Sequence, residues 1–458
     1  MNALLLTLLL GLRPTLSGPE ALRDTARFRV HFTLAGDDAP PHGAADADTV
    51  ASGIEEVSRR WIDQLGMRAP LSDGGTADDG GDGRIDVYLR RLASARGLTH
   101  PVEVGHAPAT SAFIELDPRT ALISPTRLAA AAGHEAHHAI EYAYSPSLAP
   151  WIYEATAAYV EHADFTDPAL QAETDAHFAA LLDHPETPLD RADGVHEYDE
   201  LVFVKFLIDR RPDRDAAHLG ALWEAMVREG DAIGGLTDAE GASPQALLAA
   251  FALFNLHACA ADDGMHYDPS IAGCHSSDRA APPGVGVVPA TVALPLAALA
   301  IAWRSIPLDA CHPVRAAVTG GSDVLLVLDG ADSPALPGAF VLDGDGPSST
   351  LVAASGSAPD LDLAVALAAA ASPCSQGGGA ASAGPRGSGT GSGCAIGPSH
   401  RNAANASAAA SGRGIGLVLV SALVSALVLV LSFARLRRRA GASGGVRSPA
   451  DPSPPSPA

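Results

Sequence analysis

The sequence predicts an α+β fold in which a large domain, with a mixed sheet and long helices, is followed by a smaller β-rich domain and a single C-terminal transmembrane helix. Three observations lead to this expectation: short alternating segments come first, long helical patterns follow, and an uncharged apolar run lies near the C-terminus. With 458 residues, 47% of them hydrophobic, the chain is long enough for both domains to bury a core. Its net charge of −23 repels phosphate backbones, so we expect no nucleic-acid partner.

The first predicted elements are three short strands and a helix. Residues 50–67 place apolar side chains at steps of three and four residues, which predicts a helix with one buried face. Alternating or β-branched and aromatic residues predict strands at residues 27–34, 84–92 and 111–117, the last of which reads SAFIELD. Strands and helices therefore mix in the large domain.

Long helical segments follow, and the first has a recognisable start. Ser124 can accept a hydrogen bond from the free amides of the first turn, and Pro125 suits the first helical position because proline lacks the amide hydrogen. This helix should end before Pro146. A second helix is predicted after Pro150, and another from Tyr198.

The chain changes character after the helical region. Residues 281–371 contain short Val, Leu and Ala runs broken by Gly, Pro and Asp, which predicts the β-rich domain. Residues 372–413 are dominated by Gly, Ser and Ala and are expected to form a flexible linker. The large domain should therefore occupy residues 26–275.

Both ends of the chain indicate export. Residues 1–18 contain an apolar run of about ten residues, which is too short to span a bilayer but typical of a signal peptide. Residues 414–433 carry no charge and, at ~1.5 Å per residue, would span about 30 Å as a transmembrane helix. Because an arginine cluster follows, we expect residues 434–458 to form a basic, Pro-rich cytoplasmic tail, with everything before the helix outside.

Five cysteines accompany these signs of export, and an oxidising compartment would allow disulfides. Cys259 and Cys274 are the closest pair and would close a short loop, but the sequence leaves the pairing open. Cys394 is the odd one and lies in the linker.

The segment AAGHEAHHAIEYAY matches the pattern H-E-x-x-H. His134 and His138 are four residues apart and lie on one face of a helix, where two imidazoles can hold one zinc ion, with Glu135 beside the open metal position. A catalytic zinc needs a third protein ligand, and Glu154 on the following helix suits this role, with Glu161 as the fallback.

The same residues have plainer interpretations. A single His or Glu on an alanine-rich helix is usually a solvated side chain. A zinc ion here could also be structural, in which case a fourth protein ligand would close the site, and His137 or Glu161 would be the extra donor. In a helix His137 points away from the metal face, so we expect it behind the ligands or at the surface.

The segments GHEAHHAIEYAY and PWIYEATAAYVE together resemble the gluzincin metallopeptidases and, more closely, a group of secreted metalloproteases of myxobacteria. The segment GGDGRIDVYL is similar to the part of that group upstream of the site, so the resemblance covers roughly residues 26–260. Ala155 stands where the group has glycine, a departure that leaves the ligand positions in place.

The resemblance implies a zincin-like catalytic domain. It further implies that His134, His138 and Glu154 are the zinc ligands and that Glu135 is the general base. The C-terminal region, with Cys394 before a spacer, a membrane helix and arginines, resembles the myxobacterial sorting tail. That likeness implies cleavage near the cysteine by sorting machinery and retention at the cell surface, although the long spacer and the Pro-rich extension depart from the pattern.

We therefore expect an exported zinc endopeptidase that acts on peptides or proteins. Tyr198 and His196 are the candidate donors to the oxyanion of the tetrahedral intermediate. The strand at residues 111–117 is a candidate edge along which an extended substrate could pair. The alternative is a surface adhesion or binding protein whose zinc is structural or whose peptidase fold is inactive.

Overall fold

The computed structural model describes residues 13–74, 80–103, 108–256, 267, 290–307, 314–319, 324–328, 339–342, 348–356 and 361–369. The predicted linker, transmembrane helix and cytoplasmic tail lie outside these residues, as do residues 1–12 of the predicted signal peptide and all five cysteines, Cys259, Cys274 and Cys394 among them. Among the helices within the described ranges, none combines the length and the apolar character that crossing a bilayer requires.

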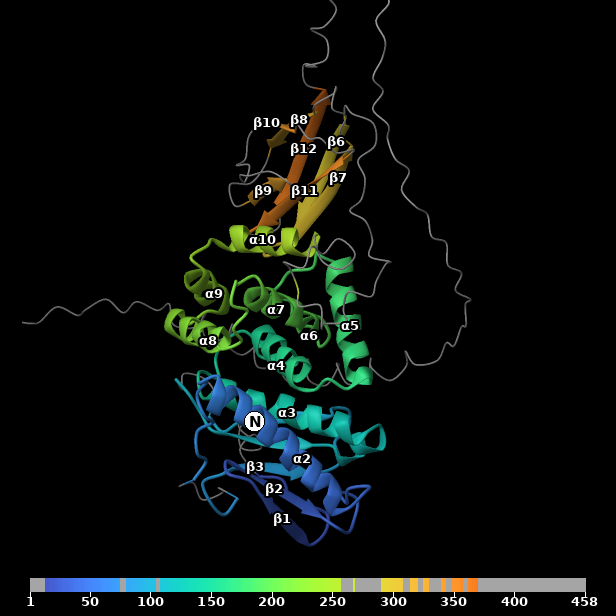
Figure 1. Cartoon of the computed structure of the whole chain (residues 1–458), viewed down its shortest axis with the longest axis vertical. Helices are drawn as coiled ribbons and strands as arrows, with labels where there is room; N and C mark the ends of the chain where they lie inside the picture. The colour runs from blue at the N-terminus through green and yellow to red at the C-terminus, as the bar shows by residue number, and fades with distance from the viewer. Residues whose placement is uncertain are drawn as a thin grey trace, which may run out of the picture.

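The described elements are stacked along the long axis of the molecule (Figure 1). A mixed five-stranded sheet lies at one end, helices fill the middle, and the β-rich part lies beyond α10 at the other end. The predicted α+β class is therefore confirmed.

The first sheet has the order β1-β2-β3-β5-β4. Its strands are β1 (Glu20–Asp24), β2 (Phe28–Thr33), β3 (Ile85–Leu89), β4 (Gly97–Pro101) and β5 (Ala112–Leu116). Strands β2, β3 and β5 are parallel and were predicted from the sequence, whereas β1 and β4 pair antiparallel on the two edges. The expectation that residues 111–117 form an edge is wrong, because β4 pairs with the outer side of β5.

Two helices cover one face of this sheet. Helix α2 (Ala44–Val57) begins earlier than predicted and continues into a π-helical segment, Ser58–Gln64. Helix α3 (Pro125–Tyr142) packs beside it, and Gly53 makes the close approach possible, since a Cβ there would lie 2.3 Å from the carbonyl oxygen of Ala129. The core beneath them is made of fully buried small and branched residues from both layers, including Val30, Val87, Ile114, Ala132 and Ala136.

The start signals that the sequence offers are confirmed. The Ser124 side chain accepts a hydrogen bond from the amide of Arg127, and α3 begins at Pro125. Helix α4 (Pro150–Asp164) begins at the second predicted proline. The segment predicted as one helix from Tyr198 forms α6 (His196–Asp199) and α7 (Leu201–Asp209) instead. The remaining helices are α5 (Pro168–Asp183), α8 (His218–Glu229), α9 (Ala232–Glu240) and α10 (Pro244–Leu256).

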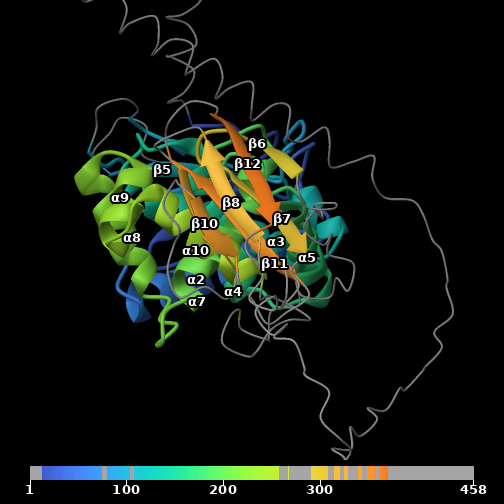
Figure 2. The ribbon, with the colours of Figure 1, turned by 90° about the horizontal axis from the view of Figure 1, so that it is seen from above.

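The predicted β-rich region forms two antiparallel sheets, with the orders β10-β8-β12-β6 and β7-β11-β9. Their strands are β6 (Ala290–Leu296), β7 (Ile301–Pro307), β8 (Val314–Thr319), β9 (Val324–Leu328), β10 (Ala339–Leu342), β11 (Ser348–Ser355) and β12 (Leu361–Ala369). Seen along the long axis, these strands lie over the helices (Figure 2).

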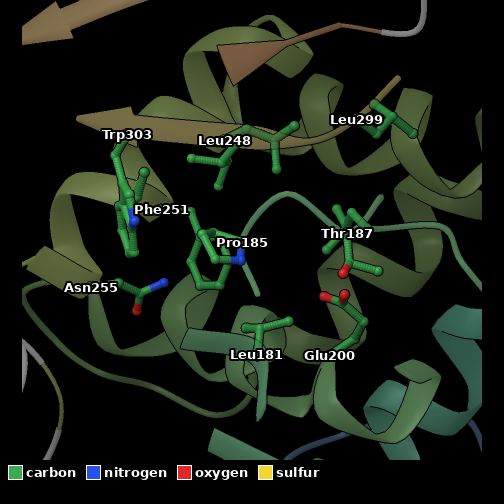
Figure 3. A pocket seen from close by; sticks show the side chains of 12 residues that line it. Leu181, Pro185, Thr187, Glu200, Leu248, Phe251, Asn255, Leu299 and Trp303 are labelled. Carbon is green, nitrogen blue, oxygen red and sulfur yellow. The ribbon is translucent and has the colours of Figure 1, made fainter. Parts of the chain in front are cut away.

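The β-rich part shares its core with the helices. Ile301, Trp303 and Val352 belong to the same buried cluster as the apolar residues of α4, α7 and α10. A cavity at this junction is lined by Phe251 of α10 and Trp303 of β7, and the Glu200 carboxylate faces it (Figure 3). In the described residues this buried cluster is therefore continuous across the junction.

Residues 13–18, which the sequence places in the signal peptide, contact the large domain. The Arg13 guanidinium lies 2.6 Å from an oxygen of Asp73 and 3.3 Å from one of Asp86, and both carboxylates are 1% exposed. Burial, together with the neighbouring Asp86 carboxylate, raises the pKa of Asp73 to about 7 even with Arg13 beside it. Cleavage after Gly18 would remove this cation from two buried acids.

We expect a chain that begins at Pro19 to be about 3–5 kcal/mol less stable than one that begins at Arg13, the usual cost of breaking a buried ion pair. Chemical denaturation of the two chains measures the difference. Arg23→Gln is the control, because Arg23 pairs with Asp48 where both side chains are about half exposed, and such a pair contributes little. Equal stability of the two chains would show that the Arg13 ion pairs do not stabilise the fold.

Candidate metal centre

Helices α3 and α4 bring two imidazoles and one carboxylate to a common point. Glu154 Oε2 lies 3.3 Å from His134 Nε2 and 3.6 Å from His138 Nε2. Suitable ligand atoms of all three residues lie within 4.8 Å of one another, and both histidines are buried. The three predicted ligands therefore form a group that could hold a metal ion.

The charges of this group favour a cation at its centre. Burial alone would lower the pKa of His134, but hydrogen bonds to Glu154 and Glu161 outweigh burial and raise the pKa to about 10. The same balance, with Glu141 and Glu154 as the acids, raises the pKa of His138 well above its usual range. Protons therefore carry positive charge here when no metal does, and a bound metal would replace them.

A second carboxylate lies behind each histidine. His138 Nδ1 is 2.7 Å from Glu141 Oε2, and His134 Nδ1 is 3.3 Å from Glu161 Oε2. These contacts fix which ring nitrogen of each histidine faces the shared centre. Glu161, predicted as the fallback ligand, thus contacts the ring nitrogen of His134 opposite to the one that faces Glu154.

Glu141 also joins the two helices that supply the candidate ligands. Its carboxylate is fully buried and accepts a hydrogen bond from the Thr156 hydroxyl on α4. The helix pattern of the sequence places Glu141 one turn beyond His138, but the contact with Thr156 depends on how α4 packs.

His137 lies away from the metal group. Its ring is completely buried against Trp61, and its Nε2 lies 3.4 Å from Glu141. Burial lowers the pKa of His137 well below its usual range, so the ring is neutral. In the part of the chain that the structure describes, neither His137 nor Glu161 closes the site as a fourth ligand.

Glu135 faces the edge strand. Its side chain is 7% exposed, and its Oε2 accepts a hydrogen bond of 2.6 Å from the hydroxyl of Thr99 on β4. Glu135, the predicted base, therefore contacts strand β4 through its carboxylate.

The two predicted oxyanion donors have different surroundings. The Tyr198 ring stacks on the His134 ring at 6.1 Å, and burial, together with the neighbouring Glu154 carboxylate, raises its pKa well above the usual range. The structure therefore brings Tyr198 to the metal group. His196 instead contacts Glu200 at 2.7 Å and Asp199 at 3.8 Å, both in its own segment of chain.

Sequence reasoning missed a further phenol. The Tyr142 ring stacks on the His138 ring at 6.5 Å, and burial raises its pKa well above the usual range. The spacing of four residues from His138 on one helix face was the signal that could have found it.

Comparisons of the chain with protein-family models, curated proteins and solved structures find no match. Two imidazoles and one carboxylate are a donor set that suits a divalent metal ion.

Proposed function

We propose that this protein is a zinc-dependent endopeptidase with a zincin-like catalytic domain. The observation that supports it best is the group of His134, His138 and Glu154, with no fourth protein ligand among the described residues and with Glu135 next to His134 in the sequence. Two histidines and a glutamate are a typical ligand set of catalytic zinc, which keeps one position for water or substrate. The donor set therefore fits zinc.

The chemistry divides between the metal and the chain. Bound zinc supplies Lewis acidity, which polarises the scissile carbonyl and makes a water more acidic. Glu135 takes a proton from the attacking water as the new C–O bond forms, and passes it to the leaving amine as the C–N bond breaks. Tyr198, next to the centre, donates a hydrogen bond to the oxyanion of the tetrahedral intermediate.

The edge strand suggests how a substrate is held. Strand β4 is the outermost strand on its side of the sheet and lies against Glu135. An extended peptide that pairs with β4 would bring its backbone past the base, so we propose backbone-directed recognition at β4 rather than at residues 111–117.

We also propose that the enzyme works outside the cytoplasm, at the cell surface. The support is the sequence alone: the apolar start of the chain and the uncharged run at residues 414–433. Cleavage near Cys394 by sorting machinery would release the domain from that run.

A protease assay of the purified chain tests the function. We expect it to cleave an unfolded protein such as casein, to lose this activity with a zinc chelator, and to regain it when zinc is added back. The control is a serine-protease inhibitor, which should change nothing. Cleavage that persists in the chelator would rule out a metal-dependent mechanism, and no cleavage by the zinc-loaded chain would favour the adhesion alternative.

A further inference from the structure

Two residues of strand β4, Gly97 and Thr99, lie against the side chain of Glu135, the candidate base. Gly97 and Thr99 are two positions apart, so they project to the same side of the strand. A Cβ built at Gly97 would lie 2.5 Å from the Cγ and from the Oε1 of Glu135. The Thr99 hydroxyl lies 2.6 Å from Glu135 Oε2 and 3.0 Å from the Glu135 backbone oxygen.

The two contacts restrict the glutamate in complementary ways. A long carboxylate side chain has several rotamers, and fixing one of them costs conformational entropy unless a neighbour holds it. Thr99 fixes Oε2 through a hydrogen bond, and Oε1 is the carboxylate oxygen that Thr99 does not contact. Gly97 provides the space in which Oε1 lies, because any side chain at position 97 would overlap it.

We propose that Thr99 and Gly97 are positioning residues for Glu135: the hydroxyl holds one carboxylate oxygen and the missing side chain leaves room for the other. This inference rests on the proposed function, because it assigns the residues a role in the proton transfer. Since both belong to the outermost strand of the sheet in the described residues, the strand proposed to pair with a substrate backbone also fixes the base.

If Thr99 positions Glu135, removing the Thr99 hydroxyl should lower kcat but leave zinc bound. Thr99→Val keeps the shape of the side chain and removes the hydroxyl, and we expect kcat to fall by about 10-fold or more, the value of a hydrogen bond to a charged group. We expect KM and zinc affinity to stay within about twofold, because no ligand moves. Thr99→Ser restores the hydroxyl and should recover most of kcat.

Thr237→Val is the matched control. The Thr237 hydroxyl is also partly buried, but it donates only to backbone oxygens of its own helix, α9, and we expect no change in kcat. A Thr99→Val protein with wild-type kcat, or a Thr99→Ser protein as slow as Thr99→Val, would refute the positioning role. Loss of zinc in Thr99→Val would refute it too, since the residue would then support the ligand helix.

Gly97→Ala tests the other half of the inference. The added methyl must displace the Glu135 carboxylate, and a displacement of about 1 Å can cost on the order of 100-fold in rate. Gly220→Ala on α8 is the control, because its Cβ would meet Met67 only at 3.5 Å, an ordinary contact. Wild-type kcat in Gly97→Ala contradicts the inference.

The outcomes separate this inference from the proposed function. A wild-type chain that binds zinc and hydrolyses peptides, with unchanged Thr99→Val and Gly97→Ala variants, refutes the positioning role alone. A wild-type chain that hydrolyses nothing refutes the proposed function and the positioning role with it.

Discussion

Replacing Glu135 by Gln should abolish hydrolysis while zinc remains bound. Glutamine keeps the shape of the side chain and can still accept the Thr99 hydrogen bond, but it cannot take a proton from water at neutral pH. Loss of a general base costs about 10²–10⁴-fold in rate. We therefore expect kcat to fall by at least about 10²-fold, with a zinc content equal to that of the wild type.

The control for Glu135→Gln is a second glutamate-to-glutamine substitution away from the metal group. Glu229→Gln at the exposed end of α8 serves, because that side chain is 44% exposed and far along the chain from the centre. We expect it to keep full activity. A Glu135→Gln protein with normal turnover would refute the role of the base, and one that loses its zinc would make Glu135 a ligand instead.

Removing a ligand should abolish zinc binding itself, whereas removing the base should leave zinc bound. Activity is lost in both cases. We expect His138→Ala to lose zinc at concentrations that saturate the wild type, and to lose activity with it. Glu141→Gln should weaken zinc binding less, by about 10–100-fold, because it leaves the ligands and removes only the carboxylate behind His138. Competition with a chromophoric chelator measures the zinc affinities of the wild type, of His138→Ala and of Glu141→Gln.

The control for this series is His184→Ala, whose side chain is 69% exposed and contacts only Glu186 among its charged neighbours. We expect its zinc affinity to match that of the wild type. If His138→Ala retained zinc at wild-type affinity, the metal would be bound elsewhere and the centre described above would be wrong.

The apparent affinity for zinc should also depend on pH, and the raised pKa values of His134 and His138 determine the direction of the change. Without metal, Glu154 and its acidic neighbours raise the pKa of His134 to about 10, so the ring carries a proton at pH 7 that zinc must displace. The apparent affinity for zinc should therefore rise with pH through this range and fall as the solution becomes more acidic.

Local features of the metal centre could be predicted from the sequence because they depend on one helix at a time. The spacing of His134 and His138 fixes their common face, and Ser124 and Pro125 fix where that helix begins. The start of α4 at Pro150 placed Glu154 near them.

Features that depend on tertiary packing could not be predicted. Strand β4 reads GLTHP, which lacks a β-strand pattern, and it is a strand only because it pairs with β5. The sequence pattern therefore indicates an edge at residues 111–117 and does not reveal the neighbours of Glu135. The contact between His196 and Glu200 could not be predicted either, because it depends on how the segment divides into α6 and α7 at Glu200.

Elemental analysis of the purified wild-type chain tests most directly whether His134, His138 and Glu154 hold one catalytic zinc ion. We expect about one zinc per chain, retained through gel filtration and absent from His138→Ala prepared in the same way. A wild-type chain without bound metal, or one whose metal content is the same with and without His138, would contradict this assignment.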